Sequence, residues 1–284
     1  MNLENLYNNH ENKISDKWSS YIEKYDELFF KYKNLAINLL EIGIQNGGSL
    51  EIYSKYFLKA KNIIGNDIHP KCNNLKFSDQ RVNLIIGDAN DNTIKEQILK
   101  LPKFDIIIDD GSHTSPDIIK SFVNYYNHLN EGGIYIVEDL HCSYWKQYHG
   151  GLFFPISSIS FFKKIVDIIN FDHWGIDKNL EWFLKLFIFN YKIDLKDLDF
   201  QSIGSIEFIN SMCIIKKQSN AIGDRVIKGK IAEVAPEIKN MGKDDLEKNK
   251  VNQVNNIFTN VKLLPEEELF VLKEKFKKIK DKVG

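Results

Sequence analysis

The stretch LEIGIQNGGSL, residues 40–50, decides the fold predicted from this sequence. An acidic residue, Glu41, closes a short apolar run, and the glycine turn at 45–48 leads into residues 49–58, whose apolar side chains share one helical face. A strand, a glycine turn and a helix in this order let a ligand approach the backbone and its free N–H groups. Gln45 stands where a dinucleotide-binding G-x-G-x-x-G turn has glycine. The stretch therefore favours an adenosyl cofactor other than NAD, with a purely structural turn as the alternative.

Further apolar runs repeat the first one, with amphipathic stretches between them, at 62–68, 82–88, 104–110 and 133–139. Strands of a parallel sheet are buried on both faces, so they are nearly continuous apolar runs. We predict an α/β fold with a Rossmann-like, mostly parallel sheet and an antiparallel last strand. Residues 205–217 read as an antiparallel pair or one long final strand, and residues 118–129 as a helical interval closed by Glu131-Gly132-Gly133.

Composition excludes several classes of protein. The 284 residues include 38 basic and 39 acidic side chains, so the broad positive field of a nucleic-acid-binding protein is absent. The three cysteines are far apart in the sequence, which argues against a disulfide scaffold and structural zinc. The N-terminus lacks an apolar signal core, and the most apolar stretch, residues 182–193, is too short to span a bilayer. We expect a cytoplasmic protein.

Three parts are predicted along the chain: a helical N-terminal arm at 1–34, a cofactor-binding domain at 35–218, and a charged extension at 219–284. The extension ends in an amphipathic helix at 264–284. Aromatic residues are dense between about 145 and 200, where we predict helices that form a lid or shape an acceptor pocket. That segment would form a homo-oligomer contact if its apolar face were exposed.

Acidic residues close the first three predicted strands. In open α/β sheets, ligands bind beyond the carboxyl ends of the strands, so these acids should converge on one crevice. Asp67 can accept the ribose hydroxyls of a nucleoside, and Asp88, followed by small Ala89, can accept from an adenine amino group. Each acid alone could equally cap a helix.

A second acidic group follows the next two strands. Asp110, Glu138 and Asp139 would form a local cluster of carboxylates, and such a cluster repels itself unless a cation compensates it. Oxygen ligands without cysteine suit Mg²⁺, Mn²⁺ or Ca²⁺. The alternative is that Asp109 and Asp110 cap a helix while Glu138 and Asp139 bind basic side chains. His113, in the turn after Asp110, is the candidate general base because its ordinary pKa fits proton removal at neutral pH.

These segments resemble the class I S-adenosylmethionine-dependent methyltransferases, and most closely the macrocin O-methyltransferase and sugar O-methyltransferase group. The matching stretches are LEIGIQNGGSL, IIGNDIHP, IIGDAND, FDIIIDDGSHT and GGIYIVEDL, all within residues 35–140. Ser15-Asp16-Lys17 also matches the family's N-terminal segment, whereas residues 18–25 depart from its histidine-bearing form. The resemblance implies Mg²⁺ at Asp110, Glu138 and Asp139, and His113 as base. It implies S-adenosylmethionine contacts from Glu41, Gly43, Gly47, Ser49, Asp67, Ile68, Asp88, Ala89 and Asp109.

The expected function is metal-dependent transfer of a methyl group from S-adenosylmethionine to a sugar hydroxyl. The acceptor would be a natural-product glycoside, a nucleotide-linked sugar or a surface polysaccharide. The alternatives are N- or carboxyl methylation of a small metabolite, an NAD-linked nucleotide-sugar oxidoreductase, and a non-enzymatic binding module. Side chains after the acid pair could contact the substrate, namely His141, His149 and the aromatic Tyr144, Trp145 and Tyr148, although the aromatic ones could equally be core.

Overall fold

A computed structural model describes residues 2–175, 180–219 and 226–240. The chain divides into two compact units. One comprises residues 1–169 and 186–223, and the other residues 170–185 and 224–284. The predicted terminal helix at 264–284 lies outside the described residues. The first unit contains the sheet and every predicted site residue.

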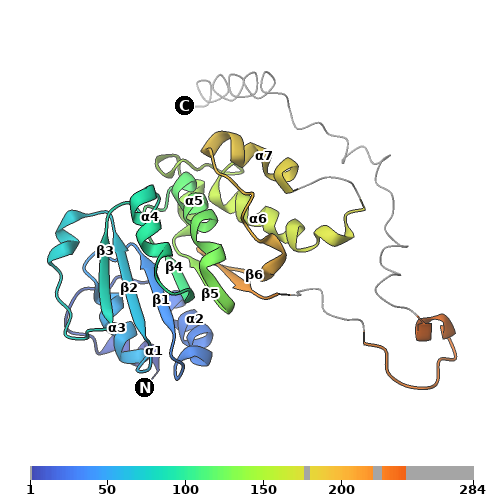
Figure 1. The fold of residues 1–284 in the computed structure, drawn as a ribbon, viewed down its shortest axis with the longest axis horizontal. Coiled ribbons are helices and arrows are strands. Elements are labelled where there is room, and N and C mark those ends of the chain that lie inside the picture. The colour runs from blue at the N-terminus through green and yellow to red at the C-terminus, as the bar shows by residue number, and fades with distance from the viewer. Residues whose placement is uncertain (1, 176–179, 220–225, 241–284) are drawn as a thin grey trace. The chain divides into compact units, whose positions relative to one another are not determined.

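The sheet of the first unit has the order β3-β2-β1-β4-β5-β7-β6 (Figure 1). The pairs among β1 to β5 are parallel, while β7 runs antiparallel to both β5 and β6. This order confirms the predicted mostly parallel sheet, and residues 205–217 prove to be the antiparallel pair. The strands are β1 Asn38–Ile42, β2 Asn62–Asp67, β3 Val82–Ile86, β4 Phe104–Asp109, β5 Leu129–Val137, β6 Ile203–Ile209 and β7 Met212–Lys217.

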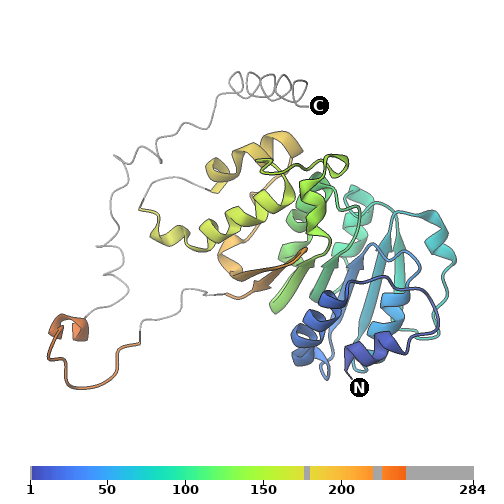
Figure 2. The same cartoon turned by 180° about the vertical axis from the view of Figure 1, so that it is seen from behind.

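Helices cover both faces of this sheet. Figure 1 shows α4 and α5 in front of the strands, and Figure 2 shows α1 and α2 on the opposite face. On that opposite face, α1, α2 and α3 form one buried core with the sheet. The α-helices are α1 Leu3–Asn8, α2 Ser19–Phe29, α3 Gly48–Tyr56, α4 Asn92–Leu99, α5 Ser115–Tyr125, α6 Ser158–Ile169 and α7 Leu180–Tyr191.

The start of β5 differs from the prediction. Glu131-Gly132-Gly133 does not close a helix, because α5 already ends at Tyr125 and β5 begins at Leu129. A register shift opposite Phe104 and Ile106 places an irregularity there, and Gly132 has a positive φ of 74°. The two glycines therefore accommodate a bulge within the strand rather than a turn before it.

The first helix of the segment predicted as a lid, α6, packs within the first unit. In α6, Phe161 and Phe162 are buried and pack edge-on against Phe122 of α5. In the second unit, Trp174 packs edge-on against Phe171 and Phe183. Among the described residues, no helix is long and apolar enough to cross a membrane.

Candidate active site

The carboxyl ends of neighbouring strands bring together the acids that the sequence singled out. Glu41 lies within β1, Asp110 follows β4, and Glu138 and Asp139 follow β5. Because β1, β4 and β5 are adjacent and parallel, their ends meet at one edge of the sheet. The predicted convergence of acidic side chains is therefore present for Glu41, Asp110, Glu138 and Asp139.

A lysine from the N-terminal arm lies among these acids. The Nζ atom of Lys17 is 2.5 Å from Asp110 Oδ2, 2.7 Å from Glu138 Oε1 and 3.4 Å from Glu41 Oε1. Its side chain is only 3% exposed. The alternative reading, in which Glu138 binds a basic side chain, is thus realised in the structure, and Glu41 and Asp110 share the same ammonium.

One ammonium shared by three carboxylates leaves negative charge uncompensated. Burial disfavours the charged form of Lys17, but Glu138, Asp110 and Glu41 outweigh burial and hold the pKa of Lys17 well above its usual value. Burial and the nearby Asp110 raise the pKa of Glu138 to about 8, even though Lys17 and Tyr25 favour its charged form. Burial likewise raises the pKa of Glu41. These raised pKa values mean that a proton relieves part of the repulsion, and a cation that binds the same carboxylate oxygens would take the place of that proton.

Two aromatic residues of α2 anchor the acid pair that follows β5. The Tyr25 hydroxyl donates to Glu138 Oε1 in the buried interior. The Tyr21 hydroxyl lies 3.0 Å from Asp139 Oδ1, and the Trp18 indole N–H donates to the same oxygen at 3.2 Å. Glu138 Oε1 and Asp139 Oδ1 are thus held by residues of the N-terminal arm, from Trp18 through α2.

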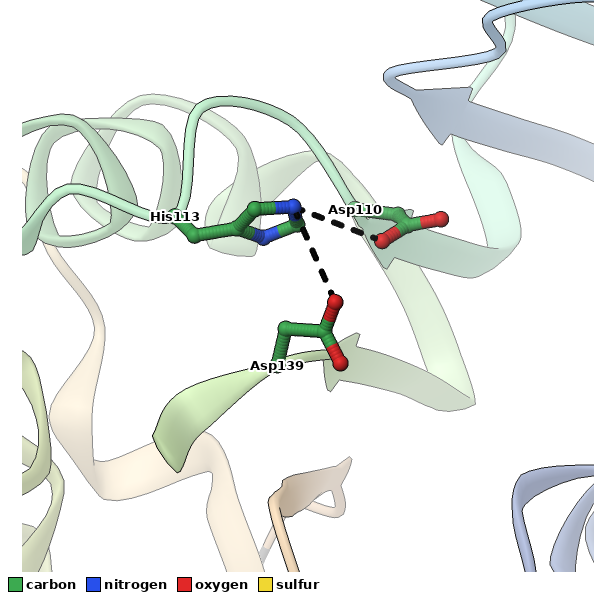
Figure 3. Close-up of side chains that lie close together, drawn as sticks. All are labelled: Asp110, His113 and Asp139. Carbon is green, nitrogen blue, oxygen red and sulfur yellow. Dashed lines mark ion pairs between the residues drawn. The ribbon is translucent and has the colours of Figure 1, made fainter. Parts of the chain in front are cut away.

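One carboxylate oxygen each of Asp110 and Asp139 faces His113 on the open side (Figure 3). His113 Nε2 is 4.0 Å from Asp110 Oδ1 and 3.8 Å from Asp139 Oδ2. His113 and Asp139 both adopt left-handed backbone conformations, with φ of 57° and 51°. Such a backbone is unfavourable for residues other than glycine, and it occurs often at functional sites, where the surrounding structure enforces it.

The predicted metal ligands therefore belong to two overlapping groups. Asp110, His113 and Asp139 can each offer an atom within 4.8 Å of the others, and so can Glu41, Asp110 and Glu138. Asp110 belongs to both groups, with Oδ2 bound to Lys17 and Oδ1 directed to His113. Asp110 and Asp139 thus keep one carboxylate oxygen each on the open side, whereas Oε1 of Glu138 is engaged by Lys17 and Tyr25.

The glycine turn lies directly beside Asp110, which follows β4. Gly43 has a φ of 86°, and a Cβ there would be 2.1 Å from the carbonyl oxygen of Asp110. Gly47 also has a positive φ, and a Cβ there would meet the Phe77 ring at 2.7 Å. Ser49 donates to Glu41 at 2.5 Å, and both side chains are buried. At both positions the space that a Cβ would fill is taken by atoms of the protein itself, so the two glycines let the turn pack closely against Asp110 and Phe77.

Asp67 holds the glycine turn in place. Its Oδ2 accepts from the backbone N–H groups of Ile44 and Gln45, and its Oδ1 accepts from the N–H of His69. A carboxylate has about four acceptor positions, so about one remains for a ribose hydroxyl. Beside it, Ile68 is 69% exposed, which is unusual for a large apolar side chain at the edge of a site.

The other predicted cofactor residues differ in exposure. Asp88 is exposed, and its Oδ1 accepts from the N–H of Asn90. Ala89 is buried, and its carbonyl accepts from the Tyr125 hydroxyl. Asp109 is buried with its Oδ2 accepting from Tyr135, and burial raises its pKa to about 7. The structure thus places Asp109 in the interior and Asp88 at the surface.

The N-terminal arm covers the glycine turn. A Cβ on Gly48 would be 2.3 Å from the carbonyl oxygen of Lys13, so residues 13–14 lie directly against the start of α3. A cavity of about 20 Å³ remains between residues 14–17 of the arm and the turn, with Lys17 and Asp110 in its wall. The arm is therefore a wall of the predicted cofactor site.

No family model matches the chain. Curated relatives include the 8-demethyl-8-α-L-rhamnosyl tetracenomycin-C 2′-O-methyltransferase of Streptomyces olivaceus, 32% identical over 164 residues, which are 54% of this chain and 42% of the relative. The demethylmacrocin O-methyltransferase of Streptomyces fradiae is 34% identical over 169 residues, 54% of this chain and 42% of the relative. The chain thus spans less than half the length of these relatives.

Among solved structures, the chain is similar to MycE methyltransferase from the mycinamycin biosynthetic pathway, in complex with Mg, S-adenosylhomocysteine and mycinamycin VI. The TM-score is 0.64 at 22% identity, over 88% of this chain and 60% of that one. The fold is that of a class I methyltransferase. In sequence, this methyltransferase-fold chain resembles the sugar O-methyltransferases, as its motifs predicted.

Sequence reasoning assigned no role to the arm residues that complete this methyltransferase-fold site. Lys17 lies in the Ser15-Asp16-Lys17 match, and Tyr21 and Tyr25 have helical spacing with Trp18, so weak signals existed. Of the residues after the acid pair, His141 contacts Ser211 and lies 3.9 Å from Asp139, whereas His149 is exposed. Trp145 and Tyr144 are exposed rather than core.

Proposed function

We propose that this chain is an S-adenosylmethionine-dependent O-methyltransferase that needs a divalent cation and methylates a hydroxyl of a neutral sugar in a small-molecule glycoside. The observation that carries the proposal is the carboxylate cluster at the ends of β1, β4 and β5, directly beside the glycine turn. The sugar O-methyltransferases with similar sequences support the reaction and the acceptor class.

The residues fit a divalent cation. One ammonium faces three carboxylates, and burial with mutual repulsion disfavours the ionised form of Glu138. Asp110, Glu138 and Asp139 would hold the ion, with Asp110 Oδ1 and Asp139 Oδ2 already directed to the open side. When bound, Mg²⁺ would hold vicinal oxygens of the acceptor and make one hydroxyl more acidic.

His113 is placed to take the proton. Its Nε2 faces the open side between Asp110 and Asp139, and a neutral imidazole accepts a proton at the nitrogen that carries none. Transfer forms a bond between the acceptor oxygen and the methyl carbon and breaks the bond from that carbon to the sulfonium. The hydroxyl proton moves to Nε2, and S-adenosylhomocysteine leaves.

The cofactor would lie across the ends of the first three strands. Glu41, Gly43, Gly47 and Ser49 are at the methionine end, Asp67 and Ile68 at the ribose, and Asp88 with Ala89 at the adenine. The exposure of Ile68 supports this placement, because an adenosyl group would cover its side chain. Asp109, being buried, would act through the position of the Asp110 backbone.

The test is methyl transfer by the purified full chain with S-adenosylmethionine and methyl α-L-rhamnopyranoside, followed by mass spectrometry of the glycoside. Methylated glycoside should form with Mg²⁺, disappear after treatment with EDTA and return when Mg²⁺ is restored. Full turnover after exhaustive chelation would refute the metal role. Methylation of amine or carboxylate metabolites, with none of glycosides, would favour the alternative transferase.

A further inference from the structure

A continuous series of rings surrounds the open side of the proposed metal site. The Trp18 ring lies edge-on to His141 at 6.4 Å, and His141 lies edge-on to Trp145 at 4.8 Å. Trp145 is 6.1 Å from Tyr148, and Tyr148 is 6.4 Å from His113. The series joins the N-terminal arm to the proposed base, although its members come from three separate segments.

The two tryptophans of this series are not used in core packing. Trp18 is 62% exposed and Trp145 is 45% exposed, whereas aromatic residues of the core such as Tyr25 and Phe122 are fully buried. Trp18 is nevertheless oriented, because its indole N–H donates to Asp139 Oδ1 at 3.2 Å. Exposed aromatic rings that are held in one orientation beside carboxylates are typical of ligand sites rather than of ordinary protein surface.

These rings are too far from the proposed adenine position to bind the cofactor base. The adenine position lies at the end of β3, whereas Trp145 follows β5 and Trp18 donates to Asp139, which also follows β5. Four strand spacings separate β3 from β5, a distance of about 19 Å at ~4.8 Å per spacing. The rings therefore belong to the acceptor side of the site.

The chemistry of this surface selects one class of ligand. Aromatic faces pack against the apolar C–H face of a pyranose, while carboxylate oxygens accept from its hydroxyl groups. Asp110 and Asp139 would repel an acidic sugar or a sugar phosphate. A neutral pyranose ring combines the apolar face with the hydroxyl edge that the two tryptophans and two acids require.

We propose that Trp18 and Trp145 form the two walls of the acceptor subsite and hold a neutral pyranose ring over Asp139 and His113. This inference rests on the proposed methyltransferase function. It adds that the N-terminal arm supplies part of the acceptor site. Lys17 contacts the carboxylate cluster, and the next residue, Trp18, would contact the sugar.

The experiment compares Trp145→Ala, Trp18→Ala and Trp18→Phe with the wild-type full chain. Each alanine variant should raise KM for methyl α-L-rhamnopyranoside at least tenfold, while kcat changes less than threefold and S-adenosylhomocysteine affinity by calorimetry is unchanged. Trp18→Phe keeps an aromatic face and should recover most of the loss in KM. Phe30→Ala is the matched control, since Phe30 is 74% exposed on a different part of the arm and should leave all three quantities unchanged.

A second measurement does not depend on turnover. Saturation-transfer NMR should show contact from the protein to the C–H protons of the rhamnoside in the wild type, and this signal should be lost in Trp145→Ala. Unchanged KM and unchanged NMR signal in both alanine variants would overturn the subsite while leaving the methyltransferase function intact. NMR contact without any methylation by the wild type would support the subsite and refute the proposed function. Preferential binding of a planar catechol would overturn the proposed occupant.

Discussion

The ammonium of Lys17 lies 2.7 Å from the carboxylate of Glu138, although 121 residues separate them in the chain. The pair is buried, and Asp110 and Glu41 share the same ammonium. Lys17 thus neutralises part of a cluster whose remaining charge would be compensated by a metal ion. The N-terminal arm is therefore an integral part of the site.

Lys17→Met should strongly destabilise the protein, because it leaves three carboxylates, two of them buried, without their cation. Removing one partner of a buried ion pair costs on the order of 3–5 kcal/mol. Mg²⁺ should raise the melting temperature of the variant more than that of the wild type, since the ion supplies the missing charge. Thermal denaturation with and without Mg²⁺ measures both effects, and Lys17→Arg serves as the charge-preserving control. An equal Mg²⁺ effect in both proteins would show that the ion does not bind to this cluster.

Ile68→Ala should weaken S-adenosylhomocysteine binding by roughly 1–2 kcal/mol, the scale of the apolar contact removed from a buried isoleucine. The melting temperature should stay the same, because the side chain is exposed without the ligand.

Asp67→Ala should reduce affinity and stability together, since Asp67 accepts three backbone N–H groups around the turn. Calorimetry and thermal denaturation on both variants separate these effects, with exposed Leu58→Ala as the control. Unchanged affinity in Ile68→Ala would contradict the placement of the cofactor.

His113→Gln should lower kcat by roughly 10²- to 10⁴-fold, the usual effect of removing a general base. S-adenosylhomocysteine affinity should change little, because Nε2 faces Asp110 and Asp139 on the acceptor side. Steady-state kinetics and calorimetry measure the two quantities. A loss of less than about tenfold would mean that the ion alone acidifies the hydroxyl and that His113 only orients the acceptor.

His128 should make stability depend on pH outside the site. Burial lowers its pKa, and its Nε2 lies 2.9 Å from the carbonyl oxygen of Leu101. The unfolded chain therefore binds the proton on His128 more readily than the folded chain does. The contribution of neutral His128 to the free energy of unfolding is complete above the ordinary histidine pKa of about 6.5 and declines as the pH falls below that value.

Urea denaturation at pH 5.5, 6.5 and 7.5 tests this expectation against His128→Gln, which keeps an amide donor for Leu101 but does not titrate. The wild type should lose more stability than the variant between pH 7.5 and 5.5. Parallel pH dependences in the two proteins would assign the effect to other groups.

The fold could be predicted from the sequence because strands buried on both faces leave compact apolar runs, as at Asn38–Ile42 and Phe104–Asp109. The start of β5 could not, since a Gly-Gly pair has the same local signature in a bulge as in a turn. The proximity of Asp110 and Glu138 could also be predicted from the sequence, because both residues directly follow strands that are parallel neighbours. The contact of Lys17 could not be predicted, because it depends on where a separate segment crosses the edge of the sheet.

The close packing of Gly43 against the Asp110 carbonyl has a thermodynamic consequence. The Asp110 N–H also donates to the Ile42 carbonyl at 2.8 Å, so the glycine turn and the end of β4, where the cofactor and the ion are proposed to bind, are in direct contact. Where two ligands bind on either side of such a contact and one changes the affinity for the other, the effect is reciprocal. If a bound ion raises the affinity for the cofactor by some factor, the bound cofactor raises the affinity for the ion by the same factor.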